Sequence, residues 1–300
     1  MTDTAVSGNL VLPPGIEPGG RYEEWRPHPV SYVVCDVDGT LIGPSALASQ
    51  EVVDAVARAR NTGIRVGYAT GRMRDAVAAL HEQLDLAGPH ILHNGAEVRA
   101  DGRTVAAWSL TPDEIDTLFT VAAMRDDLYL EIYAESGFHA SSWDERARPH
   151  WELLGAEPLS IISSAADLST TVVPKATFAT FSAEALTWLL AHLAELPVET
   201  GHAGSPRTPG MSFVNVARPG VTKGSALQRA AKYLDLHMDD VAAIGDASND
   251  LSMLAVAGTA IAMRQADAEI REAAHLVVPE VDHHGVAAAL DALIAWGRPT

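Results

Sequence analysis

Short apolar runs alternate with segments of helical periodicity from residue 31 onwards, and this alternation constrains the fold more than any other feature of the chain. The runs are β-branched and bounded by turn residues, which is typical of buried strands. We expect strands over residues 32–35, 64–69, 91–93 and 241–244, and helices over residues 50–60, 74–86 and 225–234. A series of strand, helix and strand predicts a mainly parallel sheet with right-handed crossovers.

The rhythm changes in the middle of the chain. Apolar and polar residues alternate with period two over residues 128–133, 176–181 and 211–216, which is typical of half-exposed antiparallel strands. Residues 183–195 carry leucines at helical spacing and predict a helix. These elements indicate an α+β unit inserted into an α/β core.

The chain therefore divides into three parts. Residues 1–29 are rich in proline and without sustained periodicity, so we expect an extended arm. Residues 30–96 and 218–300 should form an α/β core with a Rossmann-like parallel sheet. Residues 97–217 should form the inserted α+β unit.

Two carboxylates follow the first predicted strand, in the run Asp36-Val37-Asp38-Gly39-Thr40-Leu41. The carboxyl end of a strand is where open parallel sheets bind ligands. Carboxylates two residues apart can supply a nucleophile, an acid/base and a metal ligand at one point. The ordinary alternative is an Asp-Gly turn that closes a strand.

Three further polar segments lie at strand ends or helix starts. Thr70-Gly71-Arg72 ends the strand over residues 64–69, and Lys223-Gly224 opens the helix that follows the insertion. The run Gly245-Asp246-Ala247-Ser248-Asn249-Asp250 ends the strand over residues 241–244. Backbone N–H groups and loops face the ligand crevice at such positions.

Together these motifs resemble the haloacid dehalogenase superfamily of aspartate-nucleophile phosphatases, and most closely its Cof-type branch with a C2-type cap. Asn94-Gly95-Ala96 and residues 282–286 also look like Cof-type signatures, whereas Arg264-Gln265 departs from the usual pattern. The resemblance implies that Asp36 is the nucleophile, Asp38 the general acid/base, and that an aspartyl-phosphate forms. It also implies an Mg²⁺ ion held by Asp36, the Asp38 carbonyl oxygen and Asp246, with Asp250 acting directly or through water.

The same resemblance assigns the phosphate-binding groups. Thr70 would donate through its hydroxyl, Gly71 would let the backbone approach, and Lys223 would act on both nucleophile and phosphate. Asn249 would bind a phosphate oxygen, although helix capping is an alternative. Arg72 and Asn94 are site residues of second rank, and a structural salt bridge is an equal alternative for Arg72.

Composition narrows the function further. The formal charge of −18 argues against a nucleic-acid binder and means that local groups must attract a phosphorylated anion. No stretch is long enough to span a membrane, no secretory signal is visible, and the single cysteine, Cys35, suits a reducing cytosol. We therefore expect a cytoplasmic monomer or weak homodimer without nucleic-acid or membrane partners.

The function that these features predict is an Mg²⁺-dependent phosphatase acting on a small phosphorylated metabolite, such as a sugar phosphate. A phosphomutase would share the aspartyl-phosphate step. A non-catalytic regulatory or binding protein on the same scaffold is an alternative of another class. The intact carboxylates at positions 36, 38, 246 and 250 favour the enzyme.

Overall fold

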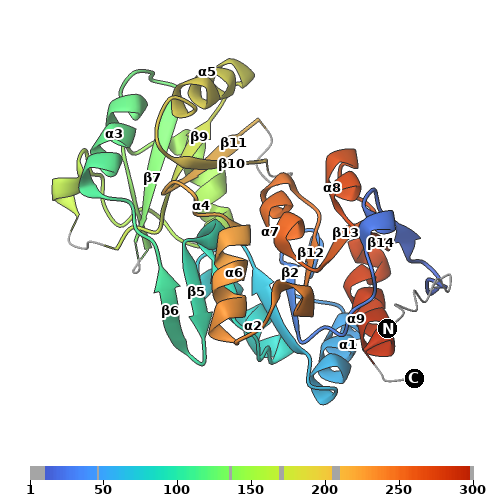
Figure 1. The fold of residues 1–300 in the computed structure, drawn as a ribbon. Coiled ribbons are helices and arrows are strands. Elements are labelled where there is room, and N and C mark those ends of the chain that lie inside the picture. Colours follow the sequence, from blue (N-terminus) through green and yellow to red (C-terminus); the bar gives the residue numbers. More distant parts are fainter. Residues whose placement is uncertain (1–10, 46, 135–136, 169–171, 205–209, 298–300) are drawn as a thin grey trace, which may run out of the picture.

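The structure is a computed structural model, which describes residues 11–297 except residues 46, 135–136, 169–171 and 205–209. Its strands form a nine-stranded and a five-stranded sheet (Figure 1). The larger sheet has the order β1-β14-β13-β12-β2-β3-β4-β5-β6. Its strands are β1 (Glu17–Pro18), β2 (Tyr32–Asp36), β3 (Arg65–Ala69), β4 (His90–Leu92), β5 (Glu97–Ala100), β6 (Arg103–Ala107), β12 (Val241–Gly245), β13 (Thr259–Met263) and β14 (Leu276–Val278).

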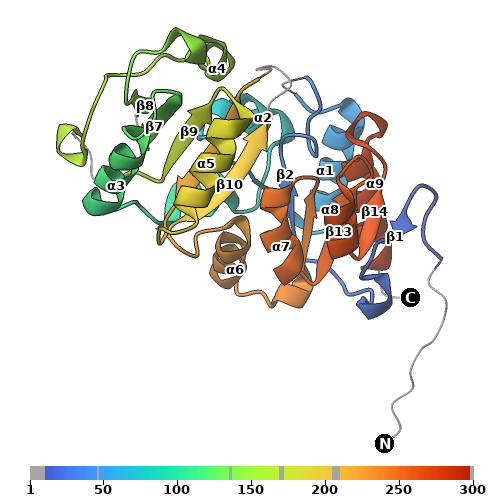
Figure 2. The same ribbon diagram turned by 90° about the horizontal axis from the view of Figure 1, so that it is seen from above.

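The centre of the larger sheet is parallel, as the strand–helix alternation predicts. All pairings from β14 to β4 are parallel, and antiparallel pairing is confined to β1 at one edge and to β5 and β6 at the other. Helices cover both faces (Figure 2). One layer holds α1 (Gln50–Asn61), α2 (Ala78–Leu84) and α9 (Gly285–Trp296), and the other α6 (Lys223–Tyr233), α7 (Leu251–Val256) and α8 (Ala268–Ala273). The α/β fold class is therefore confirmed.

The smaller sheet is antiparallel throughout and has the order β10-β11-β9-β7-β8. Its strands are β7 (Leu128–Ala134), β8 (Gly137–Ala140), β9 (Lys175–Thr180), β10 (Glu199–Gly204) and β11 (Ser212–Ala217), and its helices are α3 (Pro112–Ala122), α4 (Arg148–Leu154) and α5 (Ala183–Leu193). Helices α3 and α5 pack on one face, where Leu118, Phe178 and Leu189 share a buried cluster.

The expectation of half-exposed strands in this unit is wrong for β7 and β9, which are buried along their whole length. The face opposite α3 and α5 is covered as well, because Tyr129, Tyr133 and Phe138 pack there against Trp151 of α4 and against Phe213. The aromatic residues of the period-two pattern thus face a second core.

The boundary of the insertion also differs from the expectation. Residues 97–107, which the sequence pattern placed in the inserted unit, form β5 and β6 of the larger sheet. They continue the sheet as a hairpin from the edge strand β4, so the chain leaves the larger sheet only after Ala107. We call residues 108–217 the inserted unit from here on.

The described part of the N-terminal arm lies on the larger sheet. Strand β1 pairs antiparallel with β14, and Trp25 is buried against Trp296, with their ring centroids 5.3 Å apart. The Trp25 indole also donates a hydrogen bond of 3.1 Å to the Thr259 hydroxyl. None of the helices in the described part of the chain has the length and apolar character that a membrane crossing requires.

Candidate active site

Three neighbouring strands end at the site. Asp36 is the last residue of β2, Asp246 follows the end of β12, and Thr70 follows the end of β3. Strands β12, β2 and β3 pair in parallel in this order, so their carboxyl ends meet at one edge of the sheet. The topology therefore brings residues more than 200 positions apart in the sequence into one crevice.

A buried lysine joins two carboxylates at the centre of the site. The Lys223 Nζ lies 2.5 Å from Asp36 Oδ1 and 2.6 Å from Asp250 Oδ1. The side chains of Lys223 and Asp250 are inaccessible to solvent, and that of Asp36 is 8% exposed. Lys223 is the first residue of α6, and the Thr222 hydroxyl caps this helix by accepting a hydrogen bond from the Ser225 N–H. The cap fixes where the lysine leaves the helix.

Asp250 is engaged through both of its carboxylate oxygens. Oδ1 accepts from Lys223, and Oδ2 accepts the backbone N–H groups of Asp246 and Ala247 at 2.9 and 3.0 Å. Gly245 gives the carboxylate room, because a Cβ there would lie 2.5 Å from Asp250 Oδ2. The geometry gives Asp250 a supporting part: it orients Lys223 and holds the loop that carries Asp246.

Burial and like charge shift the pKa values of this group. Burial raises the pKa of Asp36 well above its ordinary value, the carboxylates of Asp250 and Asp246 add to the rise, and Lys223 opposes it. Burial lowers the pKa of Lys223, but Asp250 and Asp36 together raise it above its ordinary value. The pKa of Asp246 rises to about 6, first through burial and then through Asp250 and Asp38.

The acidic residues are placed to share a cation. One carboxylate oxygen each of Asp36, Asp246 and Asp250 lies within 4.8 Å of the others. Among the described residues, Asp246 Oδ1 accepts from the Thr40 hydroxyl at 2.8 Å, while Asp246 Oδ2 has no protein partner. Such hard oxygen donors, with one oxygen of Asp246 unengaged, suit Mg²⁺.

Asp38 lies at the outer side of the site. Its carboxylate is paired bidentately with Arg72, whose Nε and Nη2 donate at 2.9 and 2.5 Å. The Asp38 side chain is 57% exposed, so substrate can reach it from the solvent side. Gly39 lies between the two acidic segments with a φ of +89°, and a Cβ there would lie 2.2 Å from Asp246 Oδ2. Only glycine allows this close approach.

The segment after β3 presents a hydroxyl to the crevice. Thr70 is buried, and its Oγ1 accepts a hydrogen bond of 3.1 Å from the Arg72 N–H, so its own proton is available to another acceptor. Asn249 Nδ2 donates to Asn94 Oδ1 at 3.0 Å, and within the described part of the chain the Asn249 side chain makes no capping hydrogen bond. A Cβ on Gly71 would lie 3.1 Å from the Asn94 amide. Asn94, Gly71 and Asn249 therefore form one packed group.

Gln265, which lies in the Arg264-Gln265 pair that departs from the usual Cof-type pattern, has a structural role. Gln265 Nε2 donates to the Gly39 carbonyl at 2.5 Å, and its Oε1 accepts from the Val281 N–H at 3.3 Å. This side chain thus ties the loop after Asp38 to the segment before α9. Pattern matching missed the contact because only the fold brings residues 39, 265 and 281 together.

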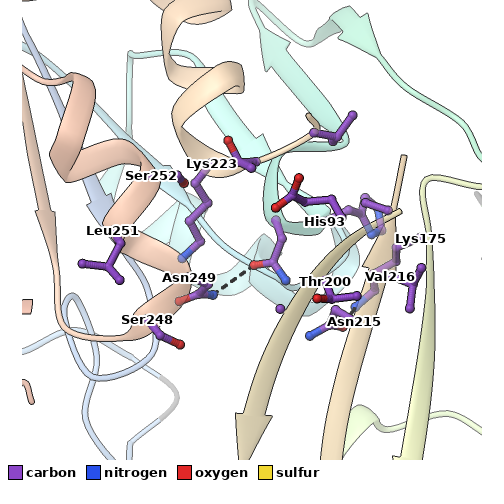
Figure 3. Close-up of a pocket in the computed structure, with 16 residues that line it drawn as sticks. His93, Lys175, Thr200, Asn215, Val216, Lys223, Ser248, Asn249, Leu251 and Ser252 are labelled. Atoms are coloured by element: carbon purple, nitrogen blue, oxygen red, sulfur yellow. Dashed lines mark hydrogen bonds between the residues drawn. The ribbon is translucent and has the colours of Figure 1, made fainter. Parts of the chain in front are cut away.

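A pocket of about 200 Å³ opens between the site and the inserted unit. Figure 3 shows Lys223, Ser248 and Asn249 on one side of it and Lys175, Thr200 and Asn215 on the other. His93 also lines the pocket, and burial, with a smaller contribution from Lys175, lowers its pKa to about 3. None of the sequence motifs includes Lys175, Asn215, Thr200 or His93, although a lysine in the apolar strand around residue 175 was a signal that could have been used.

Comparison with known proteins bears on this arrangement. Residues 33–290 match the family model described as haloacid dehalogenase-like hydrolase. The chain belongs to this family. The match covers most of the sequence, and the resemblance stated from the motifs is confirmed.

Several relatives of this hydrolase are similar over nearly their whole length. The 5-amino-6-(5-phospho-D-ribitylamino)uracil phosphatase YwtE of Bacillus subtilis is 28% identical over 88% of this chain and 98% of its own. The pyridoxal phosphate phosphatase YbhA of Escherichia coli is 26% identical over 82% of this chain and 92% of its own. The solved structure of the phosphatase BT1666 from Bacteroides thetaiotaomicron has a TM-score of 0.74 at 21% identity and covers 95% of this chain and 99% of its own, which supports the fold. The enzyme class is phosphoric monoester hydrolase.

Proposed function

We propose that this hydrolase is an Mg²⁺-dependent phosphatase that cleaves a small phosphorylated metabolite through an aspartyl-phosphate on Asp36. The observation that carries the proposal is the buried contact between Lys223 and Asp36, next to Asp246 and at the meeting point of three strand ends. A carboxylate so deeply buried costs stability unless it is paired, and this one is held at the edge of a ligand crevice.

The first step transfers the phosphoryl group. A carboxylate oxygen of Asp36 attacks phosphorus in line, the bond from phosphorus to the ester oxygen breaks, and Asp38 gives its proton to the departing alcohol. Lys223 and the Thr70 hydroxyl would donate to the phosphoryl oxygens, and Asn249, whose amide donates one proton to Asn94 Oδ1, would offer its second amide proton. These donors neutralise the charge that develops on the phosphoryl oxygens.

The second step releases phosphate. Asp38, now a carboxylate, takes a proton from a water molecule that attacks the phosphorus of the acyl-phosphate, and Asp36 is restored as its leaving carboxylate. Arg72, which donates to both oxygens of Asp38, would stabilise the carboxylate form that this step uses, whereas the protonated Asp38 of the first step would keep the contact through one oxygen only. Because the Asp38 carboxylate lies on the solvent side of Asp36, both the alcohol and the water can reach it.

Asp36 and Asp246, with the Asp38 carbonyl oxygen, would hold Mg²⁺, and Asp250 would support them from behind. When bound, Mg²⁺ supplies positive charge to the phosphoryl oxygens and to the two carboxylates. The unengaged Asp246 Oδ2 and the closeness of the three carboxylates to one another support a divalent cation at this point.

The inserted unit would select the substrate. It supplies Lys175, Thr200 and Asn215 to the pocket that continues from the phosphate site. A leaving alcohol bound there would be shielded from water on this side. No contact in the described structure favours a phosphomutase over a phosphatase, so the simpler activity is proposed.

The experiment is a comparison of Asp36→Asn with the wild-type protein on p-nitrophenyl phosphate and a metabolite panel. We expect Asp36→Asn to lose turnover by at least about 10³-fold while its circular dichroism is unchanged, because an amide is a poor nucleophile. Asp54→Asn, an exposed exchange on α1, should keep full activity. Acid quenching should trap a phosphorylated Asp36 peptide in the wild-type protein, and its absence during rapid turnover would contradict the proposed intermediate.

Metal dependence is tested on the same substrates. We expect activity with Mg²⁺, none in excess chelator, and inhibition by Ca²⁺. Calcium accepts more oxygens at longer distances, so it can engage both oxygens of Asp36 and spoil the in-line attack. Full activity in chelator would remove the metal from the proposal.

A further inference from the structure

Lysine is used sparingly in this chain. Of 21 basic residues only three are lysines, namely Lys175, Lys223 and Lys232. Lys232 is exposed at the end of α6, whereas the other two are buried and line the same pocket. The two buried lysines reach the pocket from opposite units, Lys223 from α6 and Lys175 from β9.

The two buried lysines differ in how their charge is compensated. Lys223 contacts two carboxylates, but Lys175 forms no ion pair with any described carboxylate. Its Nζ donates to the Gly71 carbonyl at 3.0 Å and to Asn215 Oδ1 at 3.3 Å, and lies 4.2 Å from the centre of the Tyr133 ring. These partners are neutral, and an ammonium group has three protons to donate.

The position of Lys175 is held from several sides. Asn215 Oδ1 also accepts from the Thr177 hydroxyl at 3.0 Å, which orients the amide toward the lysine. The bond to Gly71 reaches across from the inserted unit to the segment that presents Thr70 to the phosphate. Burial lowers the pKa of Lys175 to about 8, although the nearby Glu131 opposes the shift. The ammonium is thus fixed beside the phosphate site.

The rest of the pocket offers this ammonium little negative charge. Glu199 is the one carboxylate that lines the pocket among the described residues, and its Oε2 accepts a hydrogen bond from the Gly220 N–H. His93, which also lines the pocket, is held neutral. A buried cation without an anionic partner is unfavourable, so a ligand that brings an anion gains by pairing with it.

We propose that Lys175 is a specificity-determining residue and that it selects phosphate esters whose alcohol part carries a second anionic group, a carboxylate or a further phosphate. This inference rests on the proposed function, because it takes the ester phosphate to bind at Asp36 and Lys223. The second anion would then lie toward Asn215, on the inserted-unit side of the pocket, and accept a hydrogen bond from the Lys175 Nζ.

Matched substrate pairs test the proposal. The comparison of phosphoglycolate with ethyl phosphate measures the effect of a carboxylate on the alcohol part. The comparison of glucose 1,6-bisphosphate with glucose 6-phosphate measures the effect of a second phosphate. Turnover of p-nitrophenyl phosphate, which carries no second anionic group, reports the chemical steps alone. We expect the wild-type protein to prefer the doubly anionic member of at least one pair by about tenfold or more in kcat/KM. The pair that shows the preference tells which anion is recognised.

The variants separate charge from structure. Lys175→Met should abolish the preference, mainly through KM, and should lower kcat/KM for the doubly anionic substrate at least about fivefold more than for p-nitrophenyl phosphate. Lys175→Arg keeps the charge and should keep much of the preference. Lys175→Gln removes the charge but keeps a hydrogen-bond donor, and it should lose the preference. It replaces the methionine variant in the test if that variant folds poorly. Lys232→Met is the matched control and should behave as the wild-type protein. Circular dichroism checks folding.

Three outcomes would overturn the proposal: no preference in the wild-type protein for either pair, an unchanged preference in Lys175→Met, or an equal loss on all substrates including p-nitrophenyl phosphate. The last would make Lys175 a strut for the segment at Gly71. If the wild-type protein with Mg²⁺ hydrolyses none of the substrates, the proposed function fails instead. Calorimetric titration of the same pairs into wild-type protein and Lys175→Met then decides, and equal affinities would overturn the role of Lys175.

Discussion

Replacing Lys223 by methionine is the sharpest test of how the site is held together. The exchange keeps the length and apolar stem of the side chain but removes the cation from between Asp36 and Asp250. At 2.5 and 2.6 Å, and with an effective dielectric constant of about 20, each attraction amounts to about 6 kcal/mol before desolvation is counted. The two carboxylates would face each other, with oxygens no more than 4.8 Å apart, and repel by about 3–4 kcal/mol.

Desolvation offsets much of this attraction, so the net effect is smaller. Leaving a buried charge without its partner typically costs 3–5 kcal/mol, and we expect the free energy of unfolding of Lys223→Met to fall by about that amount at pH 7 in chelator. Urea unfolding followed by circular dichroism measures the change. Lys232→Met is the matched control, because it makes the same exchange at the exposed end of the same helix; it should cost no more than about 1 kcal/mol.

The pH dependence gives this prediction a second readout. Lys223 lowers the pKa of Asp36 against the larger raising effect of burial, so its removal raises that pKa further. A folded-state pKa above the unfolded value means that the folded variant takes up a proton which the unfolded chain does not. The stability gap between Lys223→Met and the wild-type protein should therefore narrow as the pH falls from 7 toward 5. A gap no larger than that of Lys232→Met, or one that widens on acidification, would refute the reasoning.

Two further outcomes follow from the structure. Gly39→Ala puts a Cβ 2.2 Å from Asp246 Oδ2, so Mg²⁺-dependent activity should fall at least tenfold. The control is Gly63→Ala, which has a similar φ of +91° but nothing within 4 Å of the added Cβ, and which should cost only the backbone strain of about 1–2 kcal/mol. Equal activities in the two variants would contradict the close approach at Gly39. Burial, together with His81 and Arg99, lowers the pKa of His90 to about 3, whereas its pKa in the unfolded chain is near 6.5. The folded protein holds His90 neutral, so the stability that this provides is fully present above pH 6.5 and is lost as the pH falls toward 3. At pH 5 the free energy of unfolding should be lower by about 2 kcal/mol. Unfolding curves of His90→Phe at pH 7 and 5 check this, since the variant should show a smaller pH dependence.

Local patterns were enough to predict the core of the fold. The alternation of strands and helices after residue 31 gives the parallel centre of the larger sheet, because each run is long enough and apolar enough to be read alone. The hairpin over residues 97–107 was missed for the opposite reason. Its strands β5 and β6 are short, partly polar and lie at a sheet edge, where burial on two faces no longer imposes an apolar run.

In the strands with period-two alternation, the sequence pattern does not reveal whether the polar side is exposed to solvent. Tyr129, Glu131 and Tyr133 alternate with apolar residues along β7, and an alternation of this kind normally marks a solvent-facing side. Here that side is covered by α4 and by Phe213, and Glu131 is paired with Tyr133 and His150 at 2.7 and 3.1 Å. Buried polar residues that pair with one another look like surface residues in a sequence, so only the fold distinguishes them.

In the candidate site, too, some features could be predicted from the sequence and others depend on the fold. Asp36, Lys223, Asp246 and Asp250 converge because each follows a strand end or opens a helix, and such positions can be read from sequence. The sequence left open whether Arg72 is a site residue or forms a salt bridge, and whether Asp250 acts on the metal directly or through water. The bidentate contact of Arg72 with Asp38 and the double use of Asp250 were not predicted, since hydrogen-bond direction is a property of loop geometry. The role of each residue in catalysis stays a prediction for the experiments above.

The net negative charge of the chain repels an anionic substrate, so local groups must supply the attraction. A formal charge of −18 opposes the approach of a phosphate ester at long range, but physiological salt screens exposed charges beyond about 8 Å. Lys223 and Lys175 act at contact distance and in a buried setting, where screening is weak. Because Lys223 also pairs with the carboxylates of Asp36 and Asp250, the proposed metal ion and Lys175 would supply part of the local attraction. A substrate that brings two anionic groups would meet both, so we expect higher ionic strength to weaken its binding only modestly, unlike binding through an exposed basic surface.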